Sequence, residues 1–412
     1  MRTVFVLLLA TSVAPAAWPQ VSRGAEAEFR IDNASGSLPD ASADRAGRFI
    51  VVWQQFNGDG SGIAAVGRRL SPSGDTLGSE FVVNEYTTGD QANVSVAAAP
   101  DGRFMAVWVD SGRDGSGLGV FGRLFLPSGL PAGPDFAIGV TTAGDQSVPR
   151  VATIEGGFLV VWRSEEAFGL DHIFAQVYDQ KGSTVLPEFE VPSVAGAQFQ
   201  PAAAGLRGGG FVVAWSDNLD LNTHVRVRVF DATGPRGPET QADTQIVGVW
   251  RDLRNAVAVA ARPDGGFTLA WHMMPCTIVP QPMCVEGGLQ AREYDAGGVP
   301  LGTESTFVPP DHPKAFELAL GISGRGVQLA VWSTFEQDGS GYGVYARRFG
   351  QLFPDAPFRV NISPLGDQRA AAVAVDPAGK VLVVWQTQGH IVGRLLGGLP
   401  PVDLDPAGNH MH

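Results

Sequence analysis

The hydrophobic positions of this chain form short runs that return at a nearly constant interval. Each run is four to eight residues long, is rich in Val, Phe, Ala and Trp, and is bounded by Gly, Pro or Asp, which is the pattern of strands joined by tight turns. No helical period of useful length separates these runs. An apolar pair followed by tryptophan occurs seven times, at intervals of 53 to 61 residues: Trp53, Trp108, Trp162, Trp215, Trp271, Trp332 and Trp385. The chain therefore consists of seven similar units.

Each unit predicts the same four strands. In the second unit, a run of small apolar residues at 94–100 leads through a turn to the run that contains Trp108. A Gly-rich loop then precedes a third run at 119–125, and a Pro/Gly turn leads to a short fourth run at 135–139. Four antiparallel strands repeated in this way describe the blades of a β-propeller. We therefore expect an all-β, seven-bladed β-propeller of four-stranded antiparallel blades.

The two ends of the repeat region predict how the ring closes. The fourth-strand pattern occurs at 80–84, 135–139, 188–192 and 357–361, with weaker forms near Glu239 and Glu304, and the seventh unit stops after its third strand. Residues 28–33 have the same pattern and precede the first unit. We expect this N-terminal strand to complete the last blade, because a closed ring removes the sheet edges that would otherwise be exposed.

Two residue types keep their place in nearly every unit. The seven tryptophans alternate with aliphatic residues on predicted strands, so we interpret them as packing residues between blades. An arginine recurs in the third strand of six units, with Gln176 in its place in the third unit: Arg68, Arg123, Arg228, Arg292, Arg347 and Arg394. A single ligand rarely needs identical contacts all round a ring. We therefore predict a structural pair between each arginine and a neighbouring carboxylate or carbonyl.

The segment before the repeats reads as an export signal. Arg2 precedes an apolar run at 4–13, and small residues suited to cleavage near Ala16 or Ala17 follow it. The run is too short to span a bilayer. We expect a signal peptide at 1–17, an N-terminal lead at 18–27, the propeller at 28–398 and a flexible C-terminal tail at 399–412. The mature protein is then secreted or periplasmic, without a membrane span, and is expected to be a monomer.

Charge narrows the class of partner. The formal net charge is -13 over 412 residues. An acidic surface gains nothing from nucleic acid or from an anionic membrane, so both are excluded as general partners. A cation or a neutral ligand fits this charge better.

The two cysteines lie close together, at Cys276 and Cys284. In an exported protein this spacing favours a local disulfide, which would stabilise by about 2–3 kcal/mol in the loop-entropy model. His272 is nearby, but two thiols and one imidazole fall one ligand short of a structural zinc site.

Repeated acidic loops leave two interpretations open. The loop between the second and third strands and the loop between blades emerge on the same face, and both carry Asp in three blades: Asp59, Asp114 and Asp338 in Asp-Gly-Ser-Gly, and Asp90, Asp145 and Asp367 in Gly-Asp-Gln. As turns, these loops use Asp to bond their own backbone and Gly to take a positive φ. As metal sites, Asp59, Asp114 and Asp338 would bind Ca²⁺, although the spacing of a full calcium loop is missing. We favour the turn and leave calcium as the one cofactor to test.

Function is expected where the units depart from their pattern, because a ring needs only regular turns. Irregular segments on the same face lie at 164–174, 216–225, 272–288 and 386–392, with two connections at 249–255 and 309–315. Aromatic stacking and bidentate Arg or Asp bonds from these segments could hold a sugar. The ligand-binding candidates are His172, Asp217, His224, Trp250, Arg251, His272 and His312.

The repeated loop and strand motifs carry one resemblance. "DGSGxGVxxRxF" and "GDQxxxxVA", as at 144–152, resemble repeats found in many large exported bacterial proteins, over roughly residues 28–396. The resemblance implies propeller-like arrays, often beside adhesion or calcium-binding modules, and names no reaction. The chain is more distantly similar to integrin-type seven-bladed propellers, whose calcium loops are richer in Asp.

These observations favour a secreted, non-catalytic propeller that recognises a glycan or protein partner through the irregular loops of one face. The first alternative is an exported carbohydrate-active enzyme, a polysaccharide lyase or glycoside hydrolase, that uses His172, His224, His272, Asp217 and Arg251. No nucleophile elbow, zinc signature or phosphate loop occurs in the sequence, so the catalytic residues are unknown. The second alternative is a calcium-stabilised adhesion module.

Overall fold

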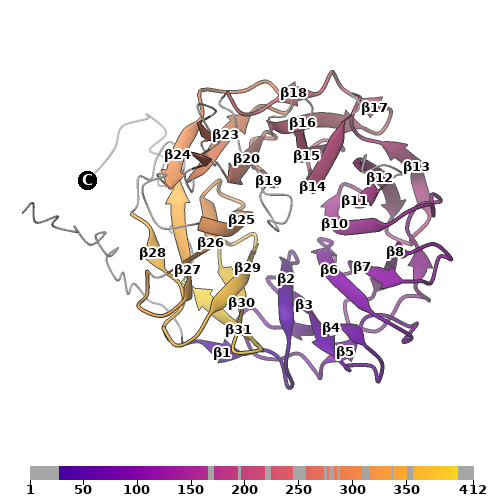
Figure 1. Ribbon diagram of the computed structural model, residues 1–412, viewed down its shortest axis with the longest axis vertical. Coiled ribbons are helices and arrows are strands. Elements are labelled where there is room, and N and C mark those ends of the chain that lie inside the picture. Colours follow the sequence, from indigo (N-terminus) through magenta and orange to yellow (C-terminus); the bar gives the residue numbers. More distant parts are fainter. Residues whose placement is uncertain are drawn as a thin grey trace, which may run out of the picture.

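Seven antiparallel sheets surround a central axis in the computed structural model of this chain (Figure 1). The structure describes residues 27–165, 171–193, 196–218, 224–244, 257–272, 276–277, 283–284, 288–308, 315–335, 337–349 and 356–397. The predicted signal peptide and the whole predicted tail lie outside these residues. Within them every regular element is a strand, and no helix able to cross a membrane occurs there. The predicted seven-bladed β-propeller is confirmed.

In each of the first three blades, the four strands are neighbours in the order in which they occur along the chain. Each places its first strand at the axis and its fourth at the rim (Figure 1). Blade 1 contains β2 (Ser37–Ala43), β3 (Phe49–Phe56), β4 (Ile63–Leu70) and β5 (Phe81–Val82). Blade 2 contains β6 (Gln91–Ala98), β7 (Phe104–Ser111), β8 (Leu118–Phe125) and β9 (Phe136–Ala137). Blade 3 contains β10 (Gln146–Ile154), β11 (Gly157–Glu165), β12 (Asp171–Asp179) and β13 (Thr184–Glu190).

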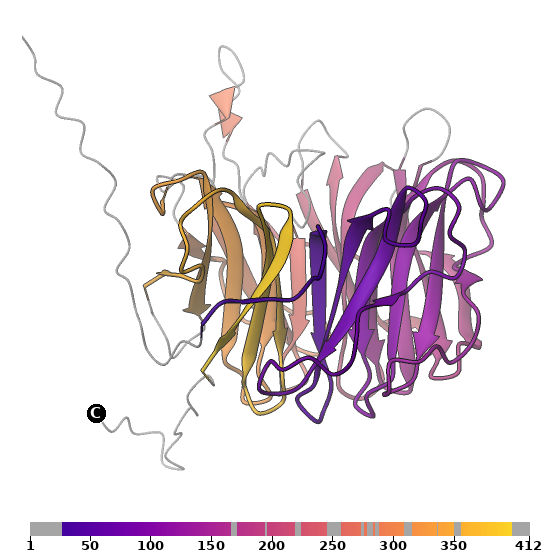
Figure 2. The ribbon, with the colours of Figure 1, turned by 90° about the horizontal axis from the view of Figure 1, so that it is seen from below.

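The next three blades keep this order with two additions. Blade 4 contains β14 (Ala197–Gly205), β15 (Phe211–Asn218), β16 (His224–Asp231) and β18 (Thr240–Gln241), and the short β17 (Gly234–Pro235) also pairs with β16. Blade 5 contains β19 (Val257–Ala261), β20 (Phe267–His272), β23 (Leu289–Tyr294) and β24 (Ser305–Val308). Between its second and third strands, β21 (Cys276–Thr277) and β22 (Met283–Cys284) form a hairpin that stands beyond one face of the ring (Figure 2). Blade 6 contains β25 (Ala315–Ile322), β26 (Gln328–Phe335), β27 (Tyr342–Phe349) and β28 (Phe358–Arg359).

The last blade is completed by the N-terminal strand, as predicted. Its sheet has the order β1-β31-β30-β29, from β29 (Gln368–Val375), β30 (Val381–Thr387), β31 (His390–Leu396) and β1 (Phe29–Arg30). Phe29 lies opposite Gly393, and Arg30 lies opposite Val392. Ile31, which follows β1, is fully buried in the cluster that joins blades 7 and 1. Closure therefore rests on both strand pairing and apolar packing.

The core lies between neighbouring blades. All seven repeat tryptophans are at most 1% exposed, which confirms them as packing residues. Each of the six repeated arginines donates a hydrogen bond to a carbonyl at or just after the fourth strand of the preceding blade. The pairs are Arg68 with Ile31, Arg123 with Val83, Arg228 with Val191, Arg292 with Ala242, Arg347 with Phe307, and Arg394 with Val360. The predicted structural role of these arginines is confirmed.

Candidate functional site

The first strands of the seven blades enclose a cavity of about 390 Å³ on the propeller axis. The strands that line it are β2, β6, β10, β14, β19, β25 and β29. This volume lies within the range of about 300–1,000 Å³ that is typical of small-molecule sites. The sequence predicted a site among the loops of one face and did not single out the cavity.

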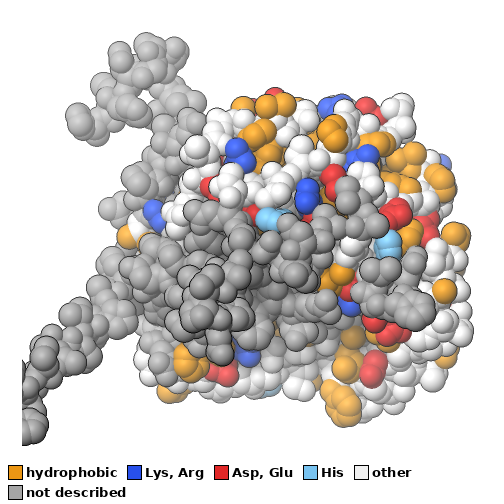
Figure 3. Space-filling view, turned by 45° about the horizontal axis from the view of Figure 1, so that its top comes forward, with side chains coloured by type: hydrophobic (Ala, Val, Ile, Leu, Met, Phe, Trp, Pro, Cys, Tyr) orange, Lys and Arg blue, Asp and Glu red, His pale blue; other side chains and the backbone are white. Residues whose placement is uncertain are grey.

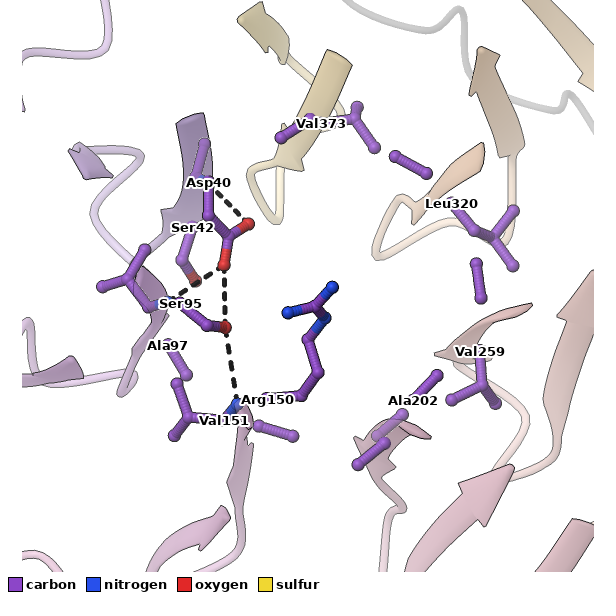
Figure 4. Close-up of a pocket in the computed structure, with 18 of the residues that line it drawn as sticks. Asp40, Ser42, Ser95, Ala97, Arg150, Val151, Ala202, Val259, Leu320 and Val373 are labelled. Atoms are coloured by element: carbon purple, nitrogen blue, oxygen red, sulfur yellow. Dashed lines mark hydrogen bonds between the residues drawn. The ribbon is translucent and has the colours of Figure 1, made fainter. Parts of the chain in front are cut away.

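The cavity has two unlike walls (Figure 4). Blades 1 to 3 contribute most of the polar and charged side chains, Asp40, Ser42, Ser95, Arg150 and Thr153, beside apolar ones such as Ala97 and Val151. Blades 4, 5, 6 and 7 contribute apolar ones, among them Ala202, Val259, Leu320 and Val373. Glu317 of blade 6 is an acidic residue within the apolar half. A ligand in this cavity therefore meets most of the hydrogen-bonding side chains on one side and mostly hydrocarbon on the other.

Hydrogen bonds between blades fix the polar wall. Asp40 Oδ2 accepts bonds from Ser95 Oγ at 2.9 Å and from the Val96 amide at 3.0 Å, and Asp40 Oδ1 accepts one from the Ala41 amide at 2.8 Å. The Val151 amide lies 3.5 Å from Ser95 Oγ, so this serine contacts the first strands of blades 1 and 3. A carboxylate bound in this way has little freedom to move, which gives the wall a fixed shape before any ligand arrives.

Arg150 extends from β10 into the cavity (Figure 4). Its Nη1 donates a hydrogen bond to the Pro149 carbonyl at 3.0 Å. A guanidinium has five N–H donors in a planar fork and no acceptor. Any group that contacts this guanidinium through a hydrogen bond must therefore be an acceptor.

A β-bulge occurs at the same level of the first strand in six blades. The pairing register shifts there, and one residue that is not glycine has a positive φ: Leu38, Asn93, Val148, Gln200, Glu317 and Ala370. Such a conformation is unfavourable for an L-residue, most of all for a β-branched one such as Val148. Side chains from preceding blades support it: Gln54 Oε1 accepts the Asn93 amide at 2.7 Å, and Glu317 Oε2 accepts the Ala370 amide. Four of these six bulge residues line the cavity: Leu38, Asn93, Glu317 and Ala370.

The repeated Asp-Gly-Ser-Gly loops are turns stabilised by their own aspartates. The Ser61, Ser116 and Ser340 amides donate to Asp59, Asp114 and Asp338 respectively, at 3.0 to 3.2 Å. Asn84 and Asn361 donate to the second oxygens of Asp59 and Asp338. Across the described residues, no group of three or more His, Cys, Asp or Glu side chains is arranged to hold a metal ion. The geometry supports the turn interpretation of these loops.

The Gly-Asp-Gln loops hold these turns in place by hydrogen bonds. Asp90, Asp145 and Asp367 accept the amide that follows each turn, from Ile63, Leu118 and Tyr342, at 2.8 to 3.1 Å. The second glycine of each turn has a positive φ, and a Cβ on Gly117 would lie 2.2 Å from Asp145 Oδ1. Only glycine fits this second position, and the first glycine of each turn has a positive φ as well.

The histidine candidates of the irregular face are held within their own blades. His172 Nδ1 lies 2.6 Å from Glu190 Oε1, and His224 Nδ1 lies 2.8 Å from Asp243 Oδ2. Figure 3 shows histidine side chains beside acidic ones on the exposed surface. His272 is buried at the end of β20. None of these three histidines lines the axial cavity.

Asp217 is the candidate with the most perturbed surroundings. Its side chain is buried on β15, and its backbone lies opposite His224 in the register of β15 and β16. Burial raises the pKa of the Asp217 carboxyl, although Arg226, 2.6 Å away, opposes the shift. Trp250, Arg251 and His312 lie outside the described residues. So do the side chains of Cys276 and Cys284, whose backbones are paired directly opposite each other.

A second buried carboxyl lies in blade 2. Asp110 is fully buried at the end of β7, and burial raises the pKa of its carboxyl to about 6. Arg113 Nη1 lies 3.8 Å from Asp110 Oδ2, while Arg113 Nη2 donates to Asp135 Oδ1 at 2.6 Å. The same guanidinium lies over the ring of Phe121, 4.3 Å from its centroid. Asp110 therefore lies in the interior of blade 2 and does not line the axial cavity.

Aligning the first strands by their bulges reveals the signal that the sequence contained for the cavity. The position two residues after the bulge holds Asp40, Ser95 and Arg150 in blades 1 to 3, and Ala202, Ala319 and Ala372 in blades 4, 6 and 7. The polar wall is therefore a departure from the repeat within the strands, whereas the predicted site residues came from departures within the loops.

Comparisons with known proteins agree on the fold. Neither a protein-family model nor a curated protein sequence matches this chain. The GH93 alpha-L-arabinofuranosidase of Fusarium graminearum, solved in complex with arabinobiose, is similar with a TM-score of 0.52 at 8% identity, over 90% of this chain and 98% of that chain. The β-propeller domain of the Trilobed protease from Pyrococcus furiosus has a TM-score of 0.50 at 10% identity, over 88% and 94%. The Pyrococcus horikoshii acylaminoacyl peptidase has a TM-score of 0.50 at 13% identity, over 89% of this chain and 52% of that chain. At these identities the likeness shows the fold alone.

Proposed function

We propose that this chain is an exported, non-catalytic binding propeller that recognises the end of a glycan in its axial cavity. The observation that carries the proposal is the division of the cavity into a polar wall from blades 1 to 3 and an apolar wall from blades 4 to 7. A sugar ring has hydroxyl groups at its edge and a face of C–H groups, so it matches both walls at once. A protein partner would instead cover the irregular loops around His172 and His224.

The arrangement of the candidate acids and bases favours binding over catalysis. A general acid or base must lie within hydrogen-bond reach of the atom it serves. His172, His224 and Asp217 pair with Glu190, Asp243 and Arg226 instead of lining the cavity. Asp40 accepts three hydrogen bonds, which hold its carboxylate against the strands of blades 1 and 2. The pairing of these side chains therefore favours a rigid binding surface over a catalytic site.

One observation favours the alternative of a carbohydrate-active enzyme. The raised pKa of Asp217, beside His224 in the strand register, is a property found at general acids. The alternative predicts that purified protein releases reducing ends or unsaturated products from polysaccharides, and that Asp217→Asn abolishes this release without unfolding the protein. Release that persists in Asp217→Asn would remove this residue from the mechanism.

A thermal-shift screen tests the binding proposal. Ligands that bind only the folded form raise its melting temperature. We expect a monosaccharide or short oligosaccharide to raise the Tm of the wild-type protein, and the shift to disappear in Ala202→Leu, which fills the cavity without changing its polarity. Ala137→Leu, at an exposed site on β9, is the matched control and should keep the shift. A shift that survives in Ala202→Leu would place the ligand elsewhere and contradict the proposal.

A further inference from the structure

A second, smaller cavity lies between blades 1 and 2, at the ends of the strands opposite the Asp-Gly-Ser-Gly loops. Its volume is about 20 Å³, and Arg48 and Arg69 are among the residues that line it. We infer that this cavity binds a small monovalent anion of the size of chloride, held by the guanidinium groups of Arg48 and Arg69. The two cavities share no lining residue, and the inference does not rest on the proposed function.

Arg69 occupies a position on the third strand that is aliphatic in four other blades. The aliphatic residues are Leu124, Val177, Val229 and Leu395. Three of them pack under a turn glycine of the next blade, 2.9 Å from where a Cβ would stand: Leu124 under Gly182, Val229 under Gly298, and Leu395 under Gly74. Arg69 Nε takes the same place under Gly129 of blade 2, 2.7 Å from where a Cβ would stand. A charged group therefore lies where the repeat buries hydrocarbon.

The half-buried guanidinium of Arg69 has no carboxylate partner among the described residues. Its Nη1 donates a hydrogen bond to the Pro127 carbonyl at 2.6 Å, and its Nη2 donates one to the Leu77 carbonyl at 3.0 Å. These carbonyls orient the guanidinium but do not neutralise it. At the same position of blade 5, Glu293 forms an ion pair with Arg262 at 2.6 Å. Because burying a charge is unfavourable unless a counter-charge accompanies it, Arg69 calls for an anion from outside the chain.

Arg48 brings a second positive charge to the same cavity. Its Nε donates to Asp44 Oδ2 at 2.6 Å, and its Nη2 lies against Gly102 of blade 2, where a Cβ would otherwise stand. Burial lowers the pKa of the Arg69 guanidinium, and the charge of Arg48 lowers it further. Asp44 also lines the cavity, so its two guanidinium groups and one carboxylate leave one positive charge in excess. A single monovalent anion balances this charge.

The size and the lining of the cavity restrict the anion. One water molecule needs roughly 10–15 Å³, so about 20 Å³ holds one small ion but not a tetrahedral oxyanion such as phosphate. Phe49, Ile50 and Phe104 make much of the remaining wall apolar, which strengthens the attraction between the guanidinium groups and an anion. A water molecule would accept the same N–H groups but would leave the excess charge in place. A halide satisfies both the volume and the charge.

Thermal unfolding of the full chain in sodium chloride and in sodium gluconate, at equal ionic strength, tests the inference. We expect the wild-type Tm to be higher in chloride by about 2 °C once chloride is about tenfold above its dissociation constant. Arg69→Leu should fold, because leucine occupies this position in blades 2 and 7, and should remove the difference between the two salts. Arg207→Leu makes the same charge change at an exposed turn of blade 4 and should keep the difference.

A wild-type crystal grown in sodium bromide locates the ion directly. We expect an anomalous bromide peak between the guanidinium groups of Arg48 and Arg69. Absence of this peak, or a chloride effect on Tm that is equal in Arg69→Leu and wild type, would overturn the inference. A Tm that rises more in phosphate than in chloride, with the rise lost in Arg69→Leu, would overturn the assignment of a halide-sized ion. If Arg69→Leu does not fold, the bromide peak in the wild type decides.

Discussion

Ser95 Oγ lies 2.9 Å from Asp40 Oδ2, and this bond joins the first strands of blades 1 and 2 along the axial cavity. The Val151 amide of blade 3 approaches the same hydroxyl at 3.5 Å. One small side chain thus contacts three blades. It holds the acidic group of the polar wall in place, so it supports both the stability of the ring and the shape of the proposed site.

Ser95→Ala tests this double role. It removes a hydrogen bond to a half-buried carboxylate, and we expect unfolding free energy to fall by about 1.5–3 kcal/mol. The affinity for a sugar ligand should fall as well, because Asp40 loses a bond that orients it. Urea denaturation and calorimetric titration measure the two effects. Ser128→Ala, at an exposed turn, is the control and should change neither. Unchanged stability in Ser95→Ala would contradict the role of this contact.

The closure of the ring predicts a large effect at Ile31. This side chain is fully buried between blades 7 and 1, immediately after β1. Ile31→Ala should lower the unfolding free energy by about 2–5 kcal/mol through lost burial and the cavity left behind. Phe56→Ala removes a larger side chain that is 77% exposed and should change stability by no more than about 0.5 kcal/mol. Equal effects of the two substitutions in urea denaturation would argue against closure by the N-terminal strand.

The buried carboxyl of Asp110 predicts how stability depends on pH. Its pKa is raised by burial to about 6, against about 3.9 in an unfolded chain. The folded state therefore holds this proton more tightly, so the contribution of Asp110 to stability is greatest below pH 4 and falls as pH rises to about 6. Asp110→Asn removes the charged form and should raise stability at pH 7.5 by about 1–3 kcal/mol, with a smaller gain at pH 4.5.

The control for this experiment is Asp101→Asn, which removes a carboxylate from an exposed turn. It should leave the pH profile of urea denaturation unchanged. A loss of stability in Asp110→Asn at pH 7.5 would mean that Arg113, 3.8 Å away, offsets the cost of burying the charge.

The Asp-Gly-Ser-Gly turns predict that alanine costs a different amount of stability at two neighbouring glycines. Gly115 and Gly117 both have positive φ, but a Cβ on Gly115 meets no atom within 4 Å, whereas a Cβ on Gly117 would lie 2.2 Å from Asp145 Oδ1. Both alanine variants should lose about 1 kcal/mol for the backbone conformation. Gly117→Ala should lose more, because the contact with the next loop must open.

The wild-type Tm should be the same in Ca²⁺ and in EDTA, because the aspartates of the Asp-Gly-Ser-Gly loops bond their own turns. A fall of Tm in EDTA would restore the calcium interpretation of Asp59, Asp114 and Asp338.

The disulfide between Cys276 and Cys284 in the hairpin of blade 5 remains a prediction that can be tested. The backbones of Cys276 and Cys284 are direct cross-strand partners, and such positions bring Cα atoms to about 4.5–5.5 Å, within the range of a disulfide. A peptide map of the unreduced protein should contain one fragment that joins both cysteines. Alkylation of both thiols without prior reduction would show that the bridge does not form.

The architecture could be read from the sequence because it is repeated. The tryptophan at one position of seven units, the arginine on the third strand and residues 28–33 before the first unit each have one structural solution in a closed ring. The structure bears out all three. Repetition averages over the irregularities that weaken a single strand prediction, so even two-residue strands such as β1 and β5 were located correctly.

The cavity could not be read in the same way. Asp40, Ser95 and Arg150 are single polar residues within short strands, and which strand faces the axis depends on the assembled ring. The positive φ of Leu38 and Val148 has no sequence signature, since neither residue is glycine or asparagine. The loops around His172 and His224 appeared more informative because they differ in length and composition. Their side chains are instead paired within their own blades.

A crystal structure of the protein soaked with a short oligosaccharide tests the central claim most directly. We predict electron density for a sugar ring in the axial cavity, between Asp40 on one side and Val259 and Leu320 on the other. Density found only on the outer loops, near His172 or His224, with an unchanged cavity, would contradict the account.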